Sequence, residues 1–265
     1  MGKVVSVRTW LVFGVGVAIS VALYAAIVAA GEGASAWLSN APSVITGVFA
    51  VLVMVWAVLQ LGLNEPVGKQ WAWLAAGVAS FQLGQIVWTY YEAVLAVEVP
   101  FPSLADVFYL SMYPFAAVGV LTALLSFKAL FDLKPALLIS GALCVLATIG
   151  LYFTVFSPIL ADTSMDQLAK AISMFYPLGD IWLILLPGVA LAITAGKLAG
   201  GRIAWPWWCA VGGYVLVAIS DVAYNVTVWN GTYQSGSIID AGWWFGFTIV
   251  ATGASLAVDI QKPKA

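Results

Sequence analysis

The stretch PSLADVFYLSMYPFAAVGVLTALLSF, residues 102–127, holds one charged residue, Asp106, at the start of a long apolar run. A helix that crosses the hydrocarbon core of a bilayer, about 30 Å thick, needs about 20 mostly apolar residues, and residues 105–127 supply them. Other stretches along the chain have the same length and character. The predicted spans are residues 10–30, 43–63, 71–94, 105–127, 136–156, 168–193, 206–228 and 238–258.

The composition of the whole chain agrees with this interpretation. Of its 265 residues, 63% are hydrophobic and 8% are charged, and the mean hydropathy is +1.02. Soluble domains contain about 25% charged residues. The connections between the predicted spans are too short for a soluble domain. We therefore predict an all-α integral membrane protein, a single transmembrane domain over residues 1–265 with eight transmembrane helices.

The positions of lysine and arginine predict the topology, because positively charged loops stay in the cytoplasm. One side of the predicted helices carries Lys3, Arg8, Lys69, Lys128, Lys134, Lys197, Arg202, Lys262 and Lys264. Only Lys170 falls on the other side. We expect a multi-pass protein of the cell (plasma) membrane with both termini in the cytoplasm. The first apolar run is about 20 residues, longer than the 7 to 15 of a signal-peptide core, which favours a retained helix.

Three of the predicted helices begin with the same pattern. Ser103, Thr163 and Ser237 each precede an aspartate by three residues: Asp106, Asp166 and Asp240. This spacing is typical of a capping box, in which the hydroxyl and the carboxylate each accept a backbone N–H at the helix start. The recurrence predicts four helical hairpins, the last three related as an internal repeat.

Three carboxylates lie deeper than any cap would require. Asp180 falls near the middle of its span, and Glu92 and Asp221 lie in the outer parts of theirs. A charge at such depth costs on the order of 2.5 to 3.5 kcal/mol, so it should face the bundle interior or a wet cavity. Gln82, Gln85, Thr89 and Glu92 follow helical spacing and form one polar stripe.

Tyrosines accompany these acids at one-turn spacing, and phenol hydroxyls can donate hydrogen bonds to carboxylates. Together they predict an acidic and aromatic pocket open to the outside, which would bind a small or cationic ligand over aromatic faces. The candidate ligand-binding residues are Gln85, Glu92, Asp106, Tyr109, Tyr113, Tyr176, Asp180, Asp221, Tyr224 and Asp240. The alternative is that each acid is an interhelical hydrogen-bond pin.

Several classes of site lack their usual residues. The chain has no histidine, the common ligand of haem and of many transition metals. It also contains no phosphate-binding loop, nucleophile elbow or HExxH motif. We therefore predict no catalytic residue, no metal site, no cofactor and no nucleic-acid partner. Tryptophans near helix ends are predicted to be interfacial anchors: Trp37, Trp71, Trp73, Trp205, Trp207 and Trp208.

Three segments resemble the multi-helix membrane region that precedes diguanylate cyclase (GGDEF) and related signalling domains in many bacterial proteins. They are PSLADVFYLSMYP (102–114), YPLGD (176–180) and SDVAYNVTVWNGTYQSGSIIDAGWW (220–244). The resemblance covers the chain from the third predicted helix onward and implies a membrane sensory region. We expect no output domain after the last helix, so a signal would pass to a separate cytoplasmic or membrane partner.

Three functions remain open at this point. The first is a non-enzymatic membrane sensor or ligand-binding module in contact with the lipid bilayer. The second is a small cation- or proton-coupled transporter, which repeats, intramembrane acids and proline-broken helices would suit. The third is a structural subunit of a larger membrane complex.

Overall fold

The computed structural model describes residues 5–262, which form a bundle of helices with no strand in that range. The α-helices are α1 (Val7–Ala30), α2 (Ala36–Leu61), α3 (Pro66–Thr89), α4 (Leu104–Ser126), α5 (Lys134–Leu151), α6 (Ser157–Ala161), α7 (Gln167–Leu178), α8 (Leu186–Ala195), α9 (Trp205–Trp229) and α10 (Ala241–Gln261). Shorter segments join or extend them: the 3₁₀ turns η1 (Gly31–Gly33), η5 (Ala199–Ala204) and η6 (Ile238–Asp240), and the π-helices η2 (Tyr90–Val94), η3 (Tyr152–Phe156) and η4 (Gly179–Leu185).

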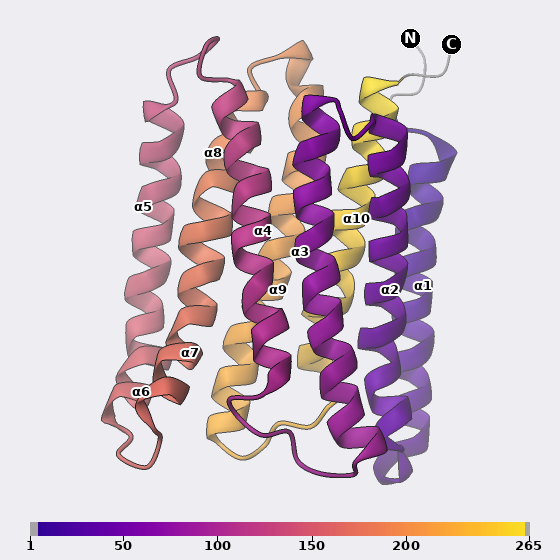
Figure 1. The fold of residues 1–265 in the computed structure, drawn as a ribbon, viewed down its shortest axis with the longest axis vertical. Coiled ribbons are helices and arrows are strands. Elements are labelled where there is room, and N and C mark those ends of the chain that lie inside the picture. Colours follow the sequence, from indigo (N-terminus) through magenta and orange to yellow (C-terminus); the bar gives the residue numbers. More distant parts are fainter. Residues whose placement is uncertain (1–4, 263–265) are drawn as a thin grey trace.

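Seven helical stretches in the described part of the chain are long and apolar enough to cross a membrane. The helical stretches are joined by short connections and alternate in direction, with α6 continuing α5 and α8 continuing α7 (Figure 1). The helix α3 runs along the bundle beside α2 and α4. The helix α3 corresponds to the predicted span 71–94 but is not one of the seven. Its glutamines and tryptophans lower its hydropathy, so the structure supports a multi-pass membrane protein without fixing the number of spans at eight.

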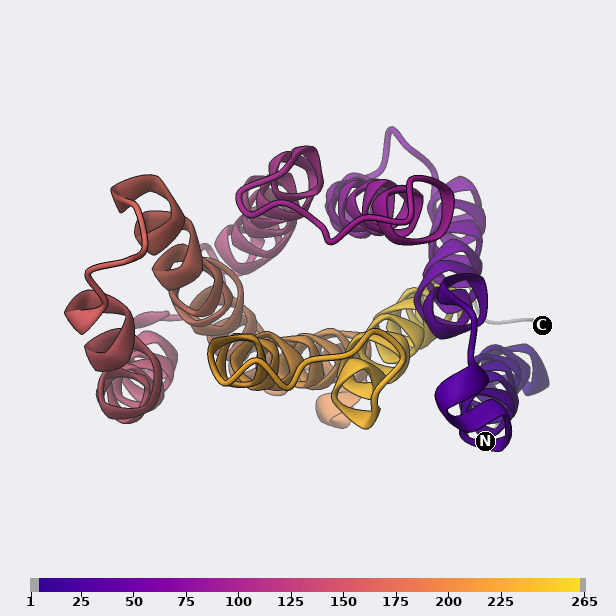
Figure 2. The same ribbon diagram turned by 90° about the horizontal axis from the view of Figure 1, so that it is seen from below.

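The bundle is an elongated ring in which α1 and α5 occupy the two extremities (Figure 2). Both helices are largely exposed: α1 buries only Thr9, Gly16 and Ser20, and the corresponding set of α5 is Ala136, Ser140 and Cys144. The interior is formed mainly by α2, α3, α4, α8, α9 and α10, which supply most of the buried apolar side chains. The predicted acids therefore lie on the helices that enclose the interior.

The two ends of the bundle differ in charge. We call the end that carries residues 5 and 262 the terminal end, and the opposite end the distal end (Figure 1). Among the described residues, every lysine and arginine except Lys170 lies at or near the terminal end. Residues 5 and 262, the first and last that the structure describes, lie at the same end.

Helices begin earlier than the apolar runs suggest. The α2 helix starts at Ala36, seven residues before the predicted residue 43, because the Ser35 hydroxyl accepts the Leu38 N–H and caps it. The α3 helix starts at Pro66, whose missing N–H and fixed φ suit the first turn. The extension of α2 brings Asn40 into a helix that faces the interior.

The three predicted capping boxes have different outcomes. The box at Ser103 and Asp106 is confirmed at the start of α4. The box at Thr163 is wrong, because Asp166 is itself the N-cap of α7 and accepts the N–H groups of Leu168 and Ala169. The four-residue pattern does not distinguish these two geometries.

The third box is also wrong. Ser237 makes no cap hydrogen bond, and Asp240 accepts the N–H of Gly236 at 2.7 Å instead of that of Ser237. Asp240 ends a 3₁₀ turn and precedes α10, so its carboxylate stabilises the loop before the helix. The helix openings are therefore not equivalent, and the internal repeat remains a prediction.

Two π-helical segments come shortly before prolines. The segment η3 ends two residues before Pro158, and η4 ends two residues before Pro187. Proline lacks the N–H for the usual i→i−4 bond and its ring crowds that carbonyl, so a widened turn relieves the conflict. The widened turn in η4 contains Asp180.

The helices α9 and α10 approach each other closely at two facing glycines. A Cβ atom on Gly213 would lie 2.5 Å from the Gly246 carbonyl oxygen, and one on Gly246 would lie 2.7 Å from that of Gly213. Small residues allow such close backbone packing in membrane helices. This contact brings the indole of Trp243, one turn from Gly246, toward α9.

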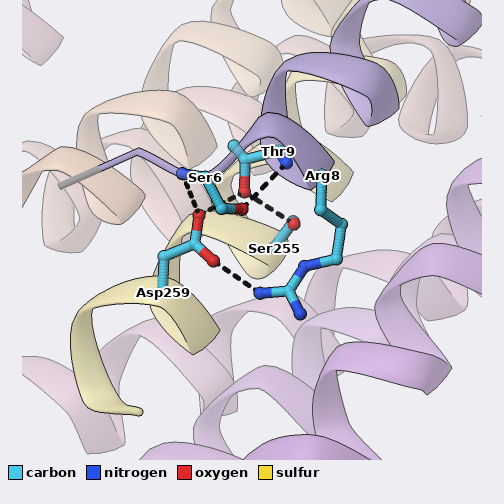
Figure 3. A network of polar contacts seen from close by, with 5 residues as sticks. All are labelled: Ser6, Arg8, Thr9, Ser255 and Asp259. Atoms are coloured by element: carbon cyan, nitrogen blue, oxygen red, sulfur yellow. Dashed lines mark hydrogen bonds and ion pairs between the residues drawn. The ribbon is translucent and has the colours of Figure 1, made fainter. Parts of the chain in front are cut away.

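A polar network ties the start of α1 to the end of α10 (Figure 3). The Arg8 guanidinium pairs with Asp259, whose carboxylate also accepts the Ser6 N–H at 2.9 Å and the Thr9 hydroxyl at 2.7 Å. Thr9 and Ser255 share a hydrogen bond of 2.8 Å. This network anchors an otherwise exposed helix at the terminal end.

The tryptophan prediction is only partly right. Trp71 is 0% exposed and Trp207 6% exposed, and their rings stack with centroids 5.2 Å apart inside the bundle. They are core residues and not interfacial anchors. Of the other predicted anchors, Trp37, Trp73, Trp205 and Trp208 are exposed.

Candidate functional site

The polar stripe of α3 faces α2. The Gln85 amide donates to Asn40 Oδ1 at 3.2 Å, and the Thr89 hydroxyl donates to the same oxygen at 3.3 Å. The Asn40 amide donates to Glu92 Oε2 at 2.7 Å. One turn deeper, the Gln82 amide donates to the Val44 carbonyl at 3.2 Å. The stripe is thus a hydrogen-bonded seam between two helices.

The second oxygen of Glu92 is bound from the connection between α9 and α10. The Ser235 hydroxyl donates to Glu92 Oε1 at 2.9 Å, and the Trp88 indole donates to Ser235 Oγ at 3.2 Å. Glu92 lies in the π-helical segment η2 and is half-buried. Both of its carboxylate oxygens therefore have partners, from two distant parts of the chain.

Asp106 joins the start of α4 to the last turn of α7. One oxygen accepts the Tyr176 hydroxyl at 2.7 Å, and the other accepts the Ser103 N–H at 2.7 Å and its hydroxyl at 3.1 Å. On the same face of α4, the Tyr109 hydroxyl donates to Gln85 Oε1 at 3.3 Å. The capping acid of the opening sequence is therefore also an interhelical contact.

Asp221 of α9 is buried and receives two side-chain donors. The Trp243 indole donates to one oxygen at 2.7 Å, and the Tyr113 hydroxyl of α4 donates to the other at 3.4 Å. Two donors favour the ionised carboxylate in this interior position. Tyr113 also packs against Tyr176, with ring centroids 6.2 Å apart, which connects this acid to the Asp106 group.

Asp180, unlike Asp221, accepts no hydrogen bond from the described residues. It is 1% exposed, and neither carboxylate oxygen has a hydrogen-bond partner among the described residues. It lies in η4, which packs on α9 and α4, and its neighbours include Asp221 and the Tyr113 hydroxyl. The Tyr214 hydroxyl of α9, which is near enough for Asp180 to act on it electrostatically, is also buried without a partner.

Asp240 holds the loop between α9 and α10. Besides the Gly236 N–H, its carboxylate accepts the Tyr233 hydroxyl at 3.2 Å. Burial, with the nearby Asp240 carboxylate, raises the pKa of the Tyr233 phenol well above its usual range. Tyr233 therefore stays a hydrogen-bond donor at all ordinary pH values.

Aromatic rings pack beside these acids at the distal end. The rings of Trp88, Tyr224 and Tyr233 are nearly perpendicular to one another, with interplanar angles of 77°, 83° and 78°. Trp243 lies against Tyr224 with centroids 6.0 Å apart. We call Trp88, Tyr224, Tyr233 and Trp243 the aromatic group. All four are half-buried.

The predicted site residues thus form neighbouring groups that tyrosines connect. Gln85 and Glu92 belong to the seam with α2, and Tyr109 links that seam to α4. Asp106 pairs with Tyr176, and the third group is Tyr113, Asp180 and Asp221. Tyr224 and Asp240 lie with the aromatic group. Whether these groups line one pocket open to the outside stays a prediction.

A cavity of about 120 Å³ lies at the terminal end, away from all these residues. Its lining includes the stacked Trp71 and Trp207 and the polar Gln70, Ser126 and Gln261. It contains none of the predicted site residues.

Several contacts of the site were missed from the sequence. Asn40 precedes the apolar run of α2, and Ser235 and Tyr233 lie in a connection, so none of them falls in a predicted span. Trp243 is a short distance along the chain from Asp240, but its contact with Asp221 depends on the packing of α9 on α10. An extension of α2 back to its Ser35 cap would have revealed Asn40.

The arrangement does not resemble a conventional metal centre. Across residues 5–262, no three histidine, cysteine, aspartate or glutamate side chains are placed to hold a metal ion. The chemistry that it offers is hydrogen bonding and the attraction of positive charge. No protein-family model matches the chain, and no curated protein or solved structure does.

Proposed function

We propose that the protein is a non-enzymatic membrane sensor or ligand-binding module whose distal end receives a small cationic ligand. One observation carries this proposal: half-buried aromatic rings adjoin carboxylates, and no basic side chain pairs with those carboxylates in the described structure. Cations bind over aromatic faces, and the attraction grows where water is excluded. Glu92 and Asp240 supply negative charge beside the rings.

The orientation of the proposed site follows from the basic residues. The terminal end, with its lysines and arginines, would face the cytoplasm, and the distal end would face outward. In this arrangement α3 is the eighth span, with its polar stripe covered by α2. The resemblance to membrane regions ahead of cyclase domains supports the sensor role, and the signal would pass to a separate partner at the terminal end.

Choline is a suitable first probe because it is a compact quaternary ammonium ion. Its binding to the full chain in lipid nanodiscs can be followed by quenching of tryptophan fluorescence. We expect saturable binding that Asp240→Asn weakens about tenfold, a change of about 1.4 kcal/mol. Asp166→Asn makes the same charge change at an exposed helix cap and should leave binding unchanged. No saturable binding, or equal weakening in both variants, would overturn the proposal.

A cation- or proton-coupled transporter is the second candidate. Asp180 supports it, because this buried acid lies in a π-helical segment between two helix-interrupting prolines, Pro177 and Pro187. Broken helices at mid-membrane are typical of transporter sites. Uptake of radiolabelled choline into proteoliposomes, driven by a proton or sodium gradient, separates transport from binding.

A further inference from the structure

We propose that Asp180 holds one exchangeable monovalent cation, a proton or Na⁺, against Asp221, with the Tyr113 and Tyr214 hydroxyls around it. This inference deepens the proposed function and rests on it for the interpretation of the protein as a membrane binding module. It names a second, inorganic ligand for the deepest part of the site.

The first step is the asymmetry between the two carboxylates. Asp221 accepts hydrogen bonds from Trp243 at 2.7 Å and Tyr113 at 3.4 Å, which favour its negative charge. Asp180 lies beside it with both oxygens unbonded and 1% of its surface exposed. Two adjacent ionised carboxylates repel each other strongly in a low-dielectric interior. The positive charge that relieves this repulsion therefore belongs on Asp180.

The second step is another buried polar group that has no hydrogen-bond partner. The Tyr214 hydroxyl is buried and has no hydrogen-bond partner among the described residues. Tyr214 lies two turns before Asp221 on α9, near enough for Asp180 to act on it electrostatically. A buried polar group without a partner costs about 1 to 3 kcal/mol, and these two groups lie on packed segments, η4 and α9, which favours a shared occupant. Carboxylate and hydroxyl oxygens suit a proton or a hard cation.

Among residues 5–262, the segments packed on η4 supply no other counter-charge for Asp180. The segment η4 packs on α4, α5, α7, α8 and α9. Their titratable groups near Asp180 are Tyr113, Cys144, Tyr176, Tyr214 and Asp221, whereas α8 has none. None of these groups carries positive charge. A single monovalent ion is the smallest occupant that leaves one stabilised anion, Asp221.

The π-helical geometry gives the site a means to exchange its ion. Asp180 is the second residue of η4, where turns are wider than in an α-helix. A change in the winding of this segment on ion exchange would move the flanking helix α7. Cation occupancy would thereby be communicated to α7, whose Tyr176 contacts Asp106 near the distal end.

The test uses the full chain in lipid nanodiscs in a sodium-free Tris buffer. Thermal unfolding is followed during titration with NaCl, and the infrared C=O band of a protonated carboxylic acid is followed as the pH is raised. A saturable rise in Tm with Na⁺ identifies the sodium form. A carboxylic acid band that disappears with rising pH and ignores Na⁺ identifies the proton form.

Asp180→Asn should abolish whichever signal the wild type shows, and Asp166→Asn should keep it. Tyr214→Phe preserves the ring and removes only the unbonded oxygen, so it tests the site even if Asp180→Asn fails to fold. We expect it to weaken the Na⁺ response about tenfold or to shift the pH midpoint by about one unit. Neither signal in the wild type, or an unchanged signal in Asp180→Asn or in Tyr214→Phe, overturns the inference.

Choline binding separates this inference from the proposed function. If choline binds to wild type and to Asp180→Asn equally while no Na⁺ or proton signal appears, the module binds its organic ligand without a deep cation. If the cation signal is present and choline does not bind, the deep site stands and the distal ligand proposal fails.

Discussion

Glu92 and Asp180 are both acids on π-helical segments, and the structure treats them in opposite ways. Glu92 has a donor for each carboxylate oxygen, Asn40 at 2.7 Å and Ser235 at 2.9 Å. Asp180 is more deeply buried and has no partner in the described chain. A satisfied buried acid stabilises a fold, whereas an unsatisfied one costs stability and is retained for another purpose. The comparison therefore separates an acid that also holds the fold together from one that does not.

The largest effect is expected where a satisfied acid loses its partner. Asn40→Leu removes the donor to Glu92 and the acceptor for Gln85 and Thr89, so it should destabilise the protein by about 2 kcal/mol. Thermal or denaturant unfolding in detergent measures this change. The matched control is Ile45→Leu, a conservative change at an exposed position of the same helix. A loss in Asn40→Leu no larger than in the control would show that the seam does not hold α2.

A smaller effect of the opposite sign is expected at Asp180. Asp180→Asn removes a carboxyl group that has no hydrogen-bond partner while it keeps the side-chain shape, so it should leave stability unchanged or raise it by up to about 1 kcal/mol. The same unfolding measurement applies, in the absence of added sodium. Glu92→Gln is the companion variant and should lower stability. If Asp180→Asn is more destabilising than Glu92→Gln, the contrast between the two acids is wrong, and Asp180 is a structural residue.

The smallest effect is expected at an exposed acid of the distal end. Asp162 accepts the Ser164 N–H and hydroxyl, each at 2.6 Å, and these hydrogen bonds lower the pKa of its carboxyl. A lowered pKa stabilises the turn above the ordinary aspartate value of about 4, and this contribution is lost as the pH falls through the lowered value.

Hydrogen exchange at the Ser164 amide reports this change. Relative to the intrinsic rate, its protection should fall below about pH 4 in the wild type and be weak at every pH in Asp162→Ala. Constant protection in the wild type across this range would contradict the assignment. The expected loss of protection would show that an acid at the surface also stabilises its turn through the hydrogen bonds that it accepts.

The sequence predicted the helices better than it predicted their ends or contacts. Apolar runs locate membrane helices because length and hydropathy dominate that choice. They do not show that Ser35 caps α2 or that the chain widens into π turns, since an extra residue per turn leaves the apolar composition unchanged. The capping pattern was right at Ser103 and wrong at Thr163 and Ser237, because Asp166 caps its helix itself and Asp240 binds a backbone N–H of the preceding loop.

The site was predicted as a set of residues and not as a set of contacts. Helical spacing placed Gln85, Thr89 and Glu92 on one face of α3, as the structure shows. It could not give their partner on α2, since Asn40 is 52 residues from Glu92. Nor could it tell that Asp221 receives donors and Asp180 does not. Those differences arise only from packing between distant segments.

The widened helix at Gly179–Leu185 also bears on how related chains should be aligned. A π turn holds one residue more than an α turn, so a relative that lacks one residue there could continue as a regular helix without losing the fold. Each residue contributes about 100° of rotation around a helix axis. In such a relative, the residue aligned with Asp180 would point about 100° away from α9. A single-residue gap at this point would therefore distinguish two kinds of relative. In one kind the two carboxylates face each other, and in the other the aspartates align in sequence but point in different directions.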